Sequence, residues 1–169
     1  GKHNKINPEK DVLSNILLGK NIGILSEAGL PCIADPGSEI VLYAHEFQIE
    51  VVPLVGPSSI FLALMSSGLN GQDFTFHGYL PIEKKERKLK IRSLEQKAKK
   101  TTQTQIFIET PYRNNQLLET ILKTCNNNIK LCIASDITSN NQCIKTKTIG
   151  EWKRTKSNFH KKPVIFLIG

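Results

Sequence analysis

The stretch from Ile22 to Gly37, I-G-I-L-S-E-A-G-L-P-C-I-A-D-P-G, constrains the fold of this chain more than any other. It begins with a short apolar run at residues 22–25, which predicts a buried strand. A loop rich in small residues follows, and Asp35 with Pro36 then predicts the N-cap and the first residue of a helix. Strand, loop and helix in this order predict an open α/β sheet, in which ligands bind at the carboxyl ends of the strands.

The same order of elements recurs at the next junction. Residues 49–54 predict a second strand, which runs into the loop Val55-Gly56-Pro57-Ser58-Ser59. Ser58 or Ser59 can cap a helix over residues 60–67. Two strand-loop-helix junctions in succession predict parallel strands joined by right-handed crossovers.

The remaining patterns complete an α/β chain that we divide into two lobes, residues 1–81 and 82–169. The strand predicted at residues 74–80 stops at Pro81, so we assign it to the end of the first lobe. The other expected helices cover residues 8–18, 36–47, 83–100 and 114–123, with a helical turn around Trp152, and the other strands cover residues 104–108, 129–134, 143–148 and 164–168.

The positive charge of the chain is concentrated in one predicted helix. The net charge is +8, which favours a polyanionic partner such as RNA. Residues 83–100 contain nine Lys and Arg against three Glu, so this helix carries +6. It is either a solvated helix face or a surface that contacts phosphates. The candidate RNA-binding residues are Lys84, Lys85, Arg87, Lys88 and Arg92.

Several classes of protein are disfavoured by what the sequence lacks. The four cysteines form no C-x-x-C pair, so we expect no metal site and interpret them as free thiols in a reducing cytoplasm. Neither a G-x-G-x-x-G fingerprint nor a phosphate-binding G-x-x-x-x-G-K-[ST] loop is present. No apolar run reaches the length of roughly 20 residues that a membrane span needs, and we find no signal peptide.

Five blocks of the sequence, in this order along nearly the whole chain, resemble the tetrapyrrole methylase superfamily: S-E-A-G-L-P-C-I-A-D-P-G, V-G-P-S-S-I-F-L-A-L-M-S-S-G-L, F-H-G-Y-L-P, I-E-T-P-Y-R and K-P-V-I-F-L-I-G. The blocks are most similar to the branch that methylates a ribose 2′-hydroxyl of small-subunit ribosomal RNA. The resemblance implies two α/β lobes, the first with a parallel sheet and the second with a mixed sheet. It also implies S-adenosylmethionine in the cleft between them, and a homodimer. The first strand and loop of that branch have no counterpart here, so the first lobe is expected to be incomplete.

By position, the resemblance also implies which residues contact the cofactor. The glycine/proline loop would lie along the methionine part, the serine pair would make a second contact, and residues of the second lobe would approach from the other side. The implied cofactor-binding residues are Glu27, Ala28, Gly29, Leu30, Pro31, Ile33, Ser58, Ser59, Glu109, Ile137 and Pro163.

The chemistry needs little more than alignment, because the methyl group of a sulfonium is already electrophilic. A ribose hydroxyl is a poor nucleophile and would benefit from a general base. Glu109, Asp35 and Glu27 are the candidate bases, and Asp35 is better explained as a helix cap. Arg113 can grip a phosphate through its planar guanidinium or pair with Glu109.

Three functions are therefore open. The first is a methyltransferase acting on structured RNA, which the basic helix and Arg113 favour. The second is a methyltransferase acting on a tetrapyrrole or another small molecule, which would favour an apolar trough and fewer cations. The third is a non-catalytic RNA-binding module that retains the fold.

Overall fold

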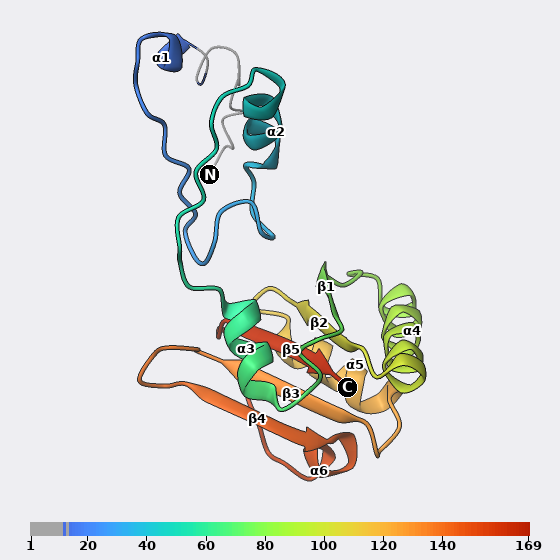
Figure 1. Ribbon diagram of the computed structural model, residues 1–169. Coiled ribbons are helices and arrows are strands. Elements are labelled where there is room, and N and C mark those ends of the chain that lie inside the picture. Colours follow the sequence, from blue (N-terminus) through green and yellow to red (C-terminus); the bar gives the residue numbers. More distant parts are fainter. Residues whose placement is uncertain (1–11, 13) are drawn as a thin grey trace. The chain divides into compact units, whose positions relative to one another are not determined.

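The computed structural model describes residue 12 and residues 14–169, and the chain divides into two compact units, residues 1–58 and 59–169 (Figure 1). The larger, C-terminal unit contains a five-stranded sheet, whereas the described residues of the N-terminal unit form short helices and irregular segments. No helix in the described residues is long and apolar enough to cross a membrane.

The described part of the N-terminal unit contains two helices, α1 (Ser14–Leu17) and α2 (Ser38–Glu46). Gly19 has a φ of 71° and its N–H donates to the carbonyl of Ile16, so it ends α1 as the sequence predicts. The start of the first predicted helix, at Asn7 and Pro8, lies outside the described residues. The predicted cap of α2 is wrong: the N-cap is Gly37, with a φ of 131° and no side-chain hydrogen bond, and the helix begins at Ser38.

The two strands predicted in the N-terminal unit, at residues 22–25 and 49–54, do not form. Their apolar side chains are exposed instead, Leu25 by 92% and Leu54 by 84%. A strand is held by hydrogen bonds to a neighbouring strand, and no strand pairing occurs among the described residues of this unit. The predicted parallel sheet of the first lobe is therefore absent from the described part of the chain.

The C-terminal unit is built on a mixed sheet with the strand order β1-β2-β5-β3-β4 (Figure 1). β1 runs parallel to β2, and the other neighbouring pairs are antiparallel. All five strands and four helices of this unit lie within a residue or two of their predicted places. They are α3 (Ser59–Ser67), β1 (Phe74–Tyr79), α4 (Lys84–Thr101), β2 (Thr104–Ile108), α5 (Asn114–Thr124), β3 (Lys130–Ser135), β4 (Cys143–Thr148), α6 (Ile149–Lys153) and β5 (Val164–Ile168).

The first strand of this sheet belongs to a different unit from the one that the sequence suggests. We expected the strand before Pro81 to close the first lobe, but β1 pairs with β2 from Phe74 to Tyr79. The chain divides after Ser58 rather than after Pro81. The alternating pattern of β1 identifies a strand, but the pattern does not say which sheet supplies its neighbour.

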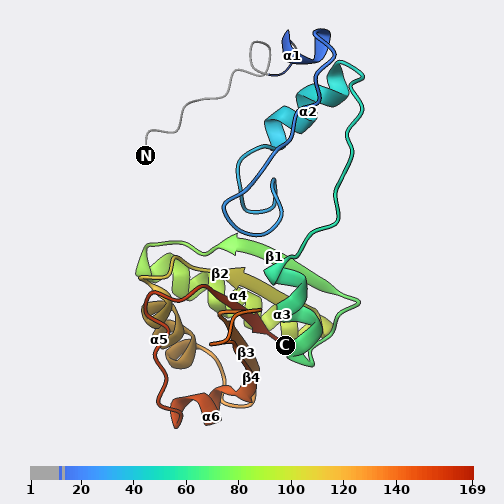
Figure 2. The ribbon, with the colours of Figure 1, turned by 90° about the vertical axis from the view of Figure 1, so that its left-hand side faces the viewer.

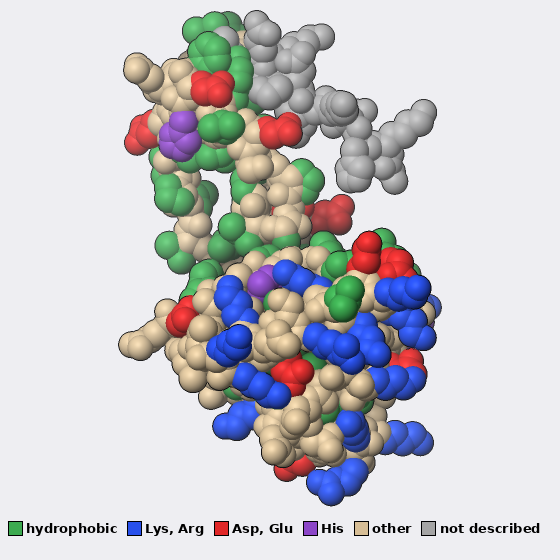
Figure 3. Space-filling model, turned by 90° about the vertical axis from the view of Figure 1, so that its right-hand side faces the viewer, with side chains coloured by type: hydrophobic (Ala, Val, Ile, Leu, Met, Phe, Trp, Pro, Cys, Tyr) green, Lys and Arg blue, Asp and Glu red, His purple; other side chains and the backbone are tan. Residues whose placement is uncertain are grey.

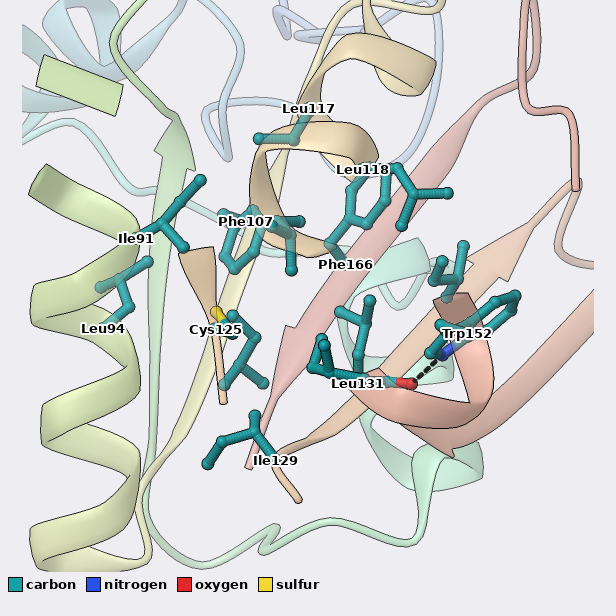
Figure 4. Close-up of a cluster of buried hydrophobic side chains, with 14 of the residues drawn as sticks. Ile91, Leu94, Phe107, Leu117, Leu118, Cys125, Ile129, Leu131, Trp152 and Phe166 are labelled. Carbon is teal, nitrogen blue, oxygen red and sulfur yellow. Dashed lines mark hydrogen bonds between the residues drawn. The ribbon is translucent and has the colours of Figure 1, made fainter. Parts of the chain in front are cut away.

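Alternating side chains of the central strands face two separate cores. On one face, Phe107, Leu131 and Phe166 pack with α4, α5 and α6. Figure 4 shows this cluster, in which Trp152 of α6 donates from Nε1 to the carbonyl of Leu131 over 2.8 Å. On the other face, Ile106 and Leu167 pack under α3, together with Cys132, Ala134 and Ile165 of the same sheet. Figure 2 shows α3 on one side of the strands and α4 with α5 on the other.

Helix α4 forms because a thin apolar stripe runs along a charged sequence. Ile91, Leu94 and Ala98 are buried against the sheet, whereas Leu89 of the same helix is exposed. The carboxylate of Glu83 caps the helix by accepting from the N–H of Glu86 over 2.8 Å. Packing of this stripe fixes the helix and leaves most of its basic residues on the outer side, whereas Arg87 is buried.

Candidate functional site

One edge of the sheet in the C-terminal unit collects the predicted residues of the second lobe. β5 is antiparallel to β2 and β3, so its beginning lies beside their ends, with Ile108 opposite Ile165 and Ser135 opposite Val164. The N–H of Asp136 donates to the carbonyl of Pro163 over 3.1 Å. Glu109, Ile137 and Pro163 are therefore brought to the same edge, although they are far apart in sequence.

The backbone at this edge is unusual in three places. Asp136, Thr138 and Lys161 have positive φ values of 51°, 68° and 61°, which residues with a Cβ adopt at a cost. The N–H of Thr138 donates to Oε1 of Gln142 over 2.8 Å, and Nζ of Lys162 lies 3.2 Å from Oδ2 of Asp136. Residues held in sparsely populated conformations cluster at functional sites, where the surrounding contacts compensate for the strain.

Glu109 is a buried carboxylate at this edge. Its side chain is completely buried, and its Oε1 accepts from the N–H of Thr110 at 2.7 Å and from Arg113 at 3.1 Å (Nε) and 2.8 Å (Nη2). Its other oxygen, Oε2, is also buried and has no hydrogen-bond partner among the described residues. A buried acceptor without a donor is costly, so Oε2 is a place where a ligand N–H or O–H would bind favourably.

Asn114 is a site residue that sequence reasoning missed. It is fully buried, and its Nδ2 donates to the carbonyls of Phe159 (3.2 Å) and Lys162 (2.7 Å), which ties α5 to the segment before β5. Its Oδ1 is buried without a partner in the described part of the chain. The available signal was a polar residue directly after the Tyr112-Arg113 junction, where a helix begins.

The glycine/proline loop of the N-terminal unit is irregular, as the sequence predicts. Gly29, Cys32 and Ala34 all have left-handed backbones, with φ values of 77°, 66° and 56°. The hydroxyl of Ser26 donates to the carbonyl of Gly29 over 2.9 Å, which closes the turn. A Cβ at Gly29 would meet no atom within 4 Å, so the space beside this backbone is open to a ligand.

The two predicted loops of the N-terminal unit lie side by side. A Cβ at Gly56 would lie only 3.0 Å from Cδ2 of Leu30, so the second loop packs closely against the first. The structure thus groups the loop that contains Glu27, Ala28 and Pro31 with the segment that leads to Ser58. Ile33 is half exposed, Asp35 is partly buried, and Ser59 begins α3 in the C-terminal unit.

The predicted basic surface lies along α4. Figure 3 shows Lys and Arg side chains gathered on this face of the C-terminal unit. Lys84, Arg87 and Lys88 line a groove between α4 and α5, whereas the other two candidates, Lys85 and Arg92, are exposed and do not line it. The groove contains none of the predicted cofactor residues.

All four cysteines are free thiols, and two are buried in the C-terminal unit. Burial raises the pKa of Cys125 to about 12 and also raises the pKa of Cys132. Both are therefore neutral core residues rather than nucleophiles. Among the described residues, no group of three or more His, Cys, Asp or Glu side chains could hold a metal ion.

Comparisons with known proteins find relatives that share one name. The chain is 30% identical over 169 residues to the ribosomal RNA small subunit methyltransferase I of Vibrio cholerae, which covers 98% of this chain and 57% of that protein. It is 34% identical to the protein of the same name from Buchnera aphidicola, with 98% of this chain and 59% of the relative covered. The Bacillus subtilis protein is 40% identical over 117 residues, which is 69% of this chain and 39% of the relative.

A solved structure gives the fold. The crystal structure of the methyltransferase CobJ matches with a TM-score of 0.55 at 18% sequence identity, and the match covers 83% of this chain and 61% of that one. No model of a known protein family matches the chain. The matches span between about two fifths and three fifths of the length of the curated relatives named above. The comparisons confirm the predicted resemblance: nearly the whole chain is similar to the ribosomal RNA small subunit methyltransferase I proteins, and its fold is similar to that of a solved methyltransferase.

Proposed function

We propose that the protein is an S-adenosylmethionine-dependent methyltransferase that modifies small-subunit ribosomal RNA, at a ribose 2′-hydroxyl. The observation that carries this proposal is the match to ribosomal RNA methyltransferases over 98% of the chain. The relatives bear the function in their names, and the matched region includes both loops of the N-terminal unit and the sheet edge at Glu109.

The residues present fit S-adenosylmethionine, a nucleoside that carries an amino acid. The open backbone at Gly29 admits a ligand, and the buried Oε2 of Glu109 offers an acceptor without a donor. The cofactor would be held by the loop from Glu27 to Pro31 with Ile33, by Ser58 and Ser59, and by Glu109, Ile137 and Pro163. When bound, it supplies an electrophilic methyl group, so the protein needs to align the acceptor and exclude water.

Glu109 and Arg113 would act as one unit. Arg113 donates twice to Oε1, which fixes the carboxylate and leaves Oε2 as its free acceptor. Oε2 can accept a hydrogen bond from the cofactor or the proton of the substrate hydroxyl. Asp35 does not cap α2, so its carboxylate stays a second candidate base. Arg113 is then a positioning residue rather than a phosphate ligand.

RNA is the favoured substrate class because of the charge on the C-terminal unit. The basic face of α4 suits a polyanion, whereas a tetrapyrrole would favour an apolar trough. A non-catalytic RNA-binding module would keep this face without binding cofactor. The oligomer and compartment predicted from the sequence, a homodimer in the cytoplasm, stay predictions that sedimentation and cell fractionation can test.

Calorimetric titration with S-adenosylmethionine, followed by transfer of labelled methyl to natural ribosomal RNA, tests the proposal. Gly29→Ala is expected to weaken cofactor binding, since its Cβ would enter the open space of the loop. Gly68→Ala is the matched control, because Gly68 has a φ of 70° against 77° at Gly29 and also has no neighbouring atom within 4 Å. Equal losses would indicate backbone strain, and no binding by the unmodified protein would leave only the non-catalytic function.

A further inference from the structure

A groove of about 290 Å³ lies between α4 and α5, and four cationic side chains surround it. The single carboxylate of the groove, Glu119, is paired with Lys123, and both side chains are largely exposed. The net charge of the lining is therefore +3. Its residues are Lys84, Arg87 and Lys88 from α4 and Gln116, Glu119, Thr120, Lys123 and Thr124 from α5.

Arg87 is the unusual member of this group, because its charge is buried without an ion pair among the described residues. The residue is only 6% exposed, and its Nη1 donates to the carbonyl of Ile82 over 3.2 Å. No carboxylate forms an ion pair with it among the described residues, and its Nε is buried without a hydrogen-bond partner. A buried charge is normally paired, so an anion at this position would relieve an energetic cost.

Thr124, which also has an unpartnered donor, lines the same groove from the other helix. The hydroxyl Oγ1 of Thr124 is buried and has no partner in the described part of the chain. Threonine hydroxyls and arginine guanidinium groups are both common donors to phosphate oxygens. The groove therefore combines two donors without partners, on facing helices, with three lysines. This set of groups suits the binding of a phosphate.

We propose that this groove holds a backbone phosphate of the RNA substrate; the inference rests on the function proposed above. The volume lies just below the range of roughly 300–1,000 Å³ found for ligand pockets, so it suits one phosphate with part of its nucleotide. Exposed cations continue along α4 at Lys85 and Arg92, as Figure 3 illustrates for this face. This row favours a chain of phosphates over a single free anion.

The test compares two double variants of the full chain that each remove two positive charges. Lys88→Gln with Lys123→Gln changes the groove, and Lys97→Gln with Lys100→Gln changes α4 outside it. Binding to in-vitro-transcribed small-subunit ribosomal RNA is measured over a series of salt concentrations without cofactor. We expect the groove variant to bind RNA about tenfold more weakly. The slope of log K against log[salt] should also become shallower by about 0.7–0.9, the change expected for one lost phosphate contact. The control should change affinity about threefold or less.

The other outcomes overturn one proposal or the other. Equal losses in the two variants, or none in the groove variant, would show that α4 is a solvated charged face, and the methyltransferase proposal would stand. Millimolar inorganic pyrophosphate should compete with RNA less strongly for the groove variant than for the control. Equal competition in the two variants would show that the groove does not bind RNA. If the unmodified protein binds no RNA at any salt concentration, the RNA substrate itself is refuted. Fluorescence of Trp152 verifies that every variant is folded.

Discussion

The buried ion pair between Glu109 and Arg113 allows a quantitative test of the site. The Glu109 side chain is fully buried and that of Arg113 is 28% exposed. Arg113 supplies two of the three hydrogen bonds that Oε1 receives. Arg113→Met would therefore leave a buried carboxylate with a single donor, the N–H of Thr110.

The expected cost follows from measured buried pairs. Removing one partner of such a pair destabilises a protein by about 3–5 kcal/mol, and the partial exposure of Arg113 places this case near the lower end, at about 3 kcal/mol. Glu109→Gln removes the charge, so adding Arg113→Met to it should cost less. We expect a coupling energy of about 2 kcal/mol from the double-mutant cycle.

Urea unfolding followed by the fluorescence of Trp152 measures these energies. Trp152 is the single tryptophan of the chain and is 3% exposed in the C-terminal core, so its signal reports the unit that contains the pair. The matched control is the cycle for Glu119 and Lys123, which have the same spacing but are exposed, and we expect no measurable coupling there. A coupling below about 0.5 kcal/mol for Glu109 and Arg113 would refute the argument that burial makes this pair structurally important.

Three further predictions concern the same unit. Leu117→Ala should cost about 2–5 kcal/mol of unfolding free energy because Leu117 is fully buried, whereas Leu89→Ala, at an exposed position, should change it by less than about 0.5 kcal/mol; urea titration decides. Burial lowers the pKa of His77 below 6.5 in the folded protein, so the unfolded chain binds the proton more tightly. The free energy of unfolding should therefore be at its maximum above pH 6.5 and should decrease as the pH drops from there through the folded-state pKa of His77. His77→Gln should remove that fall, and an unchanged pH profile would contradict it. Because burial raises the thiol pKa of Cys125 and Cys132, neither should react with a disulfide reagent at pH 8 until the protein unfolds, and rapid labelling of either would contradict the burial.

The secondary structure of the C-terminal unit could be predicted from the sequence because each element carries a local signal. The stripe of Ile91 and Leu94 marks α4, and the alternation before Pro81 marks β1. Gly68, with a φ of 70°, ends α3 where the sequence places the stop. Such patterns depend on backbone periods and turn chemistry within a few residues, so they need no knowledge of distant contacts.

The distant partner that a strand needs could not be predicted in this way. The apolar run at residues 22–25 has the composition of a buried strand, yet it stays irregular and exposed because no neighbouring strand lies in the described part of its unit. The pattern of β1 likewise predicted a strand without showing that it pairs with β2. Strand pairing is a contact between distant residues, and the local sequence does not specify it.

The sequence by itself indicated the resemblance to the tetrapyrrole methylase superfamily, the irregular loop around Gly29 and the concentration of charge on α4. Only the tertiary structure decided that, among the described residues, Glu109 has one buried oxygen without a hydrogen bond, that Asn114 joins its edge of the sheet, and that Arg87 is a buried cation without an ion pair. The physical reason is that burial and hydrogen-bond partners arise when distant segments pack together. A residue type gives the available chemistry, and the packing around it decides which atoms remain for a ligand.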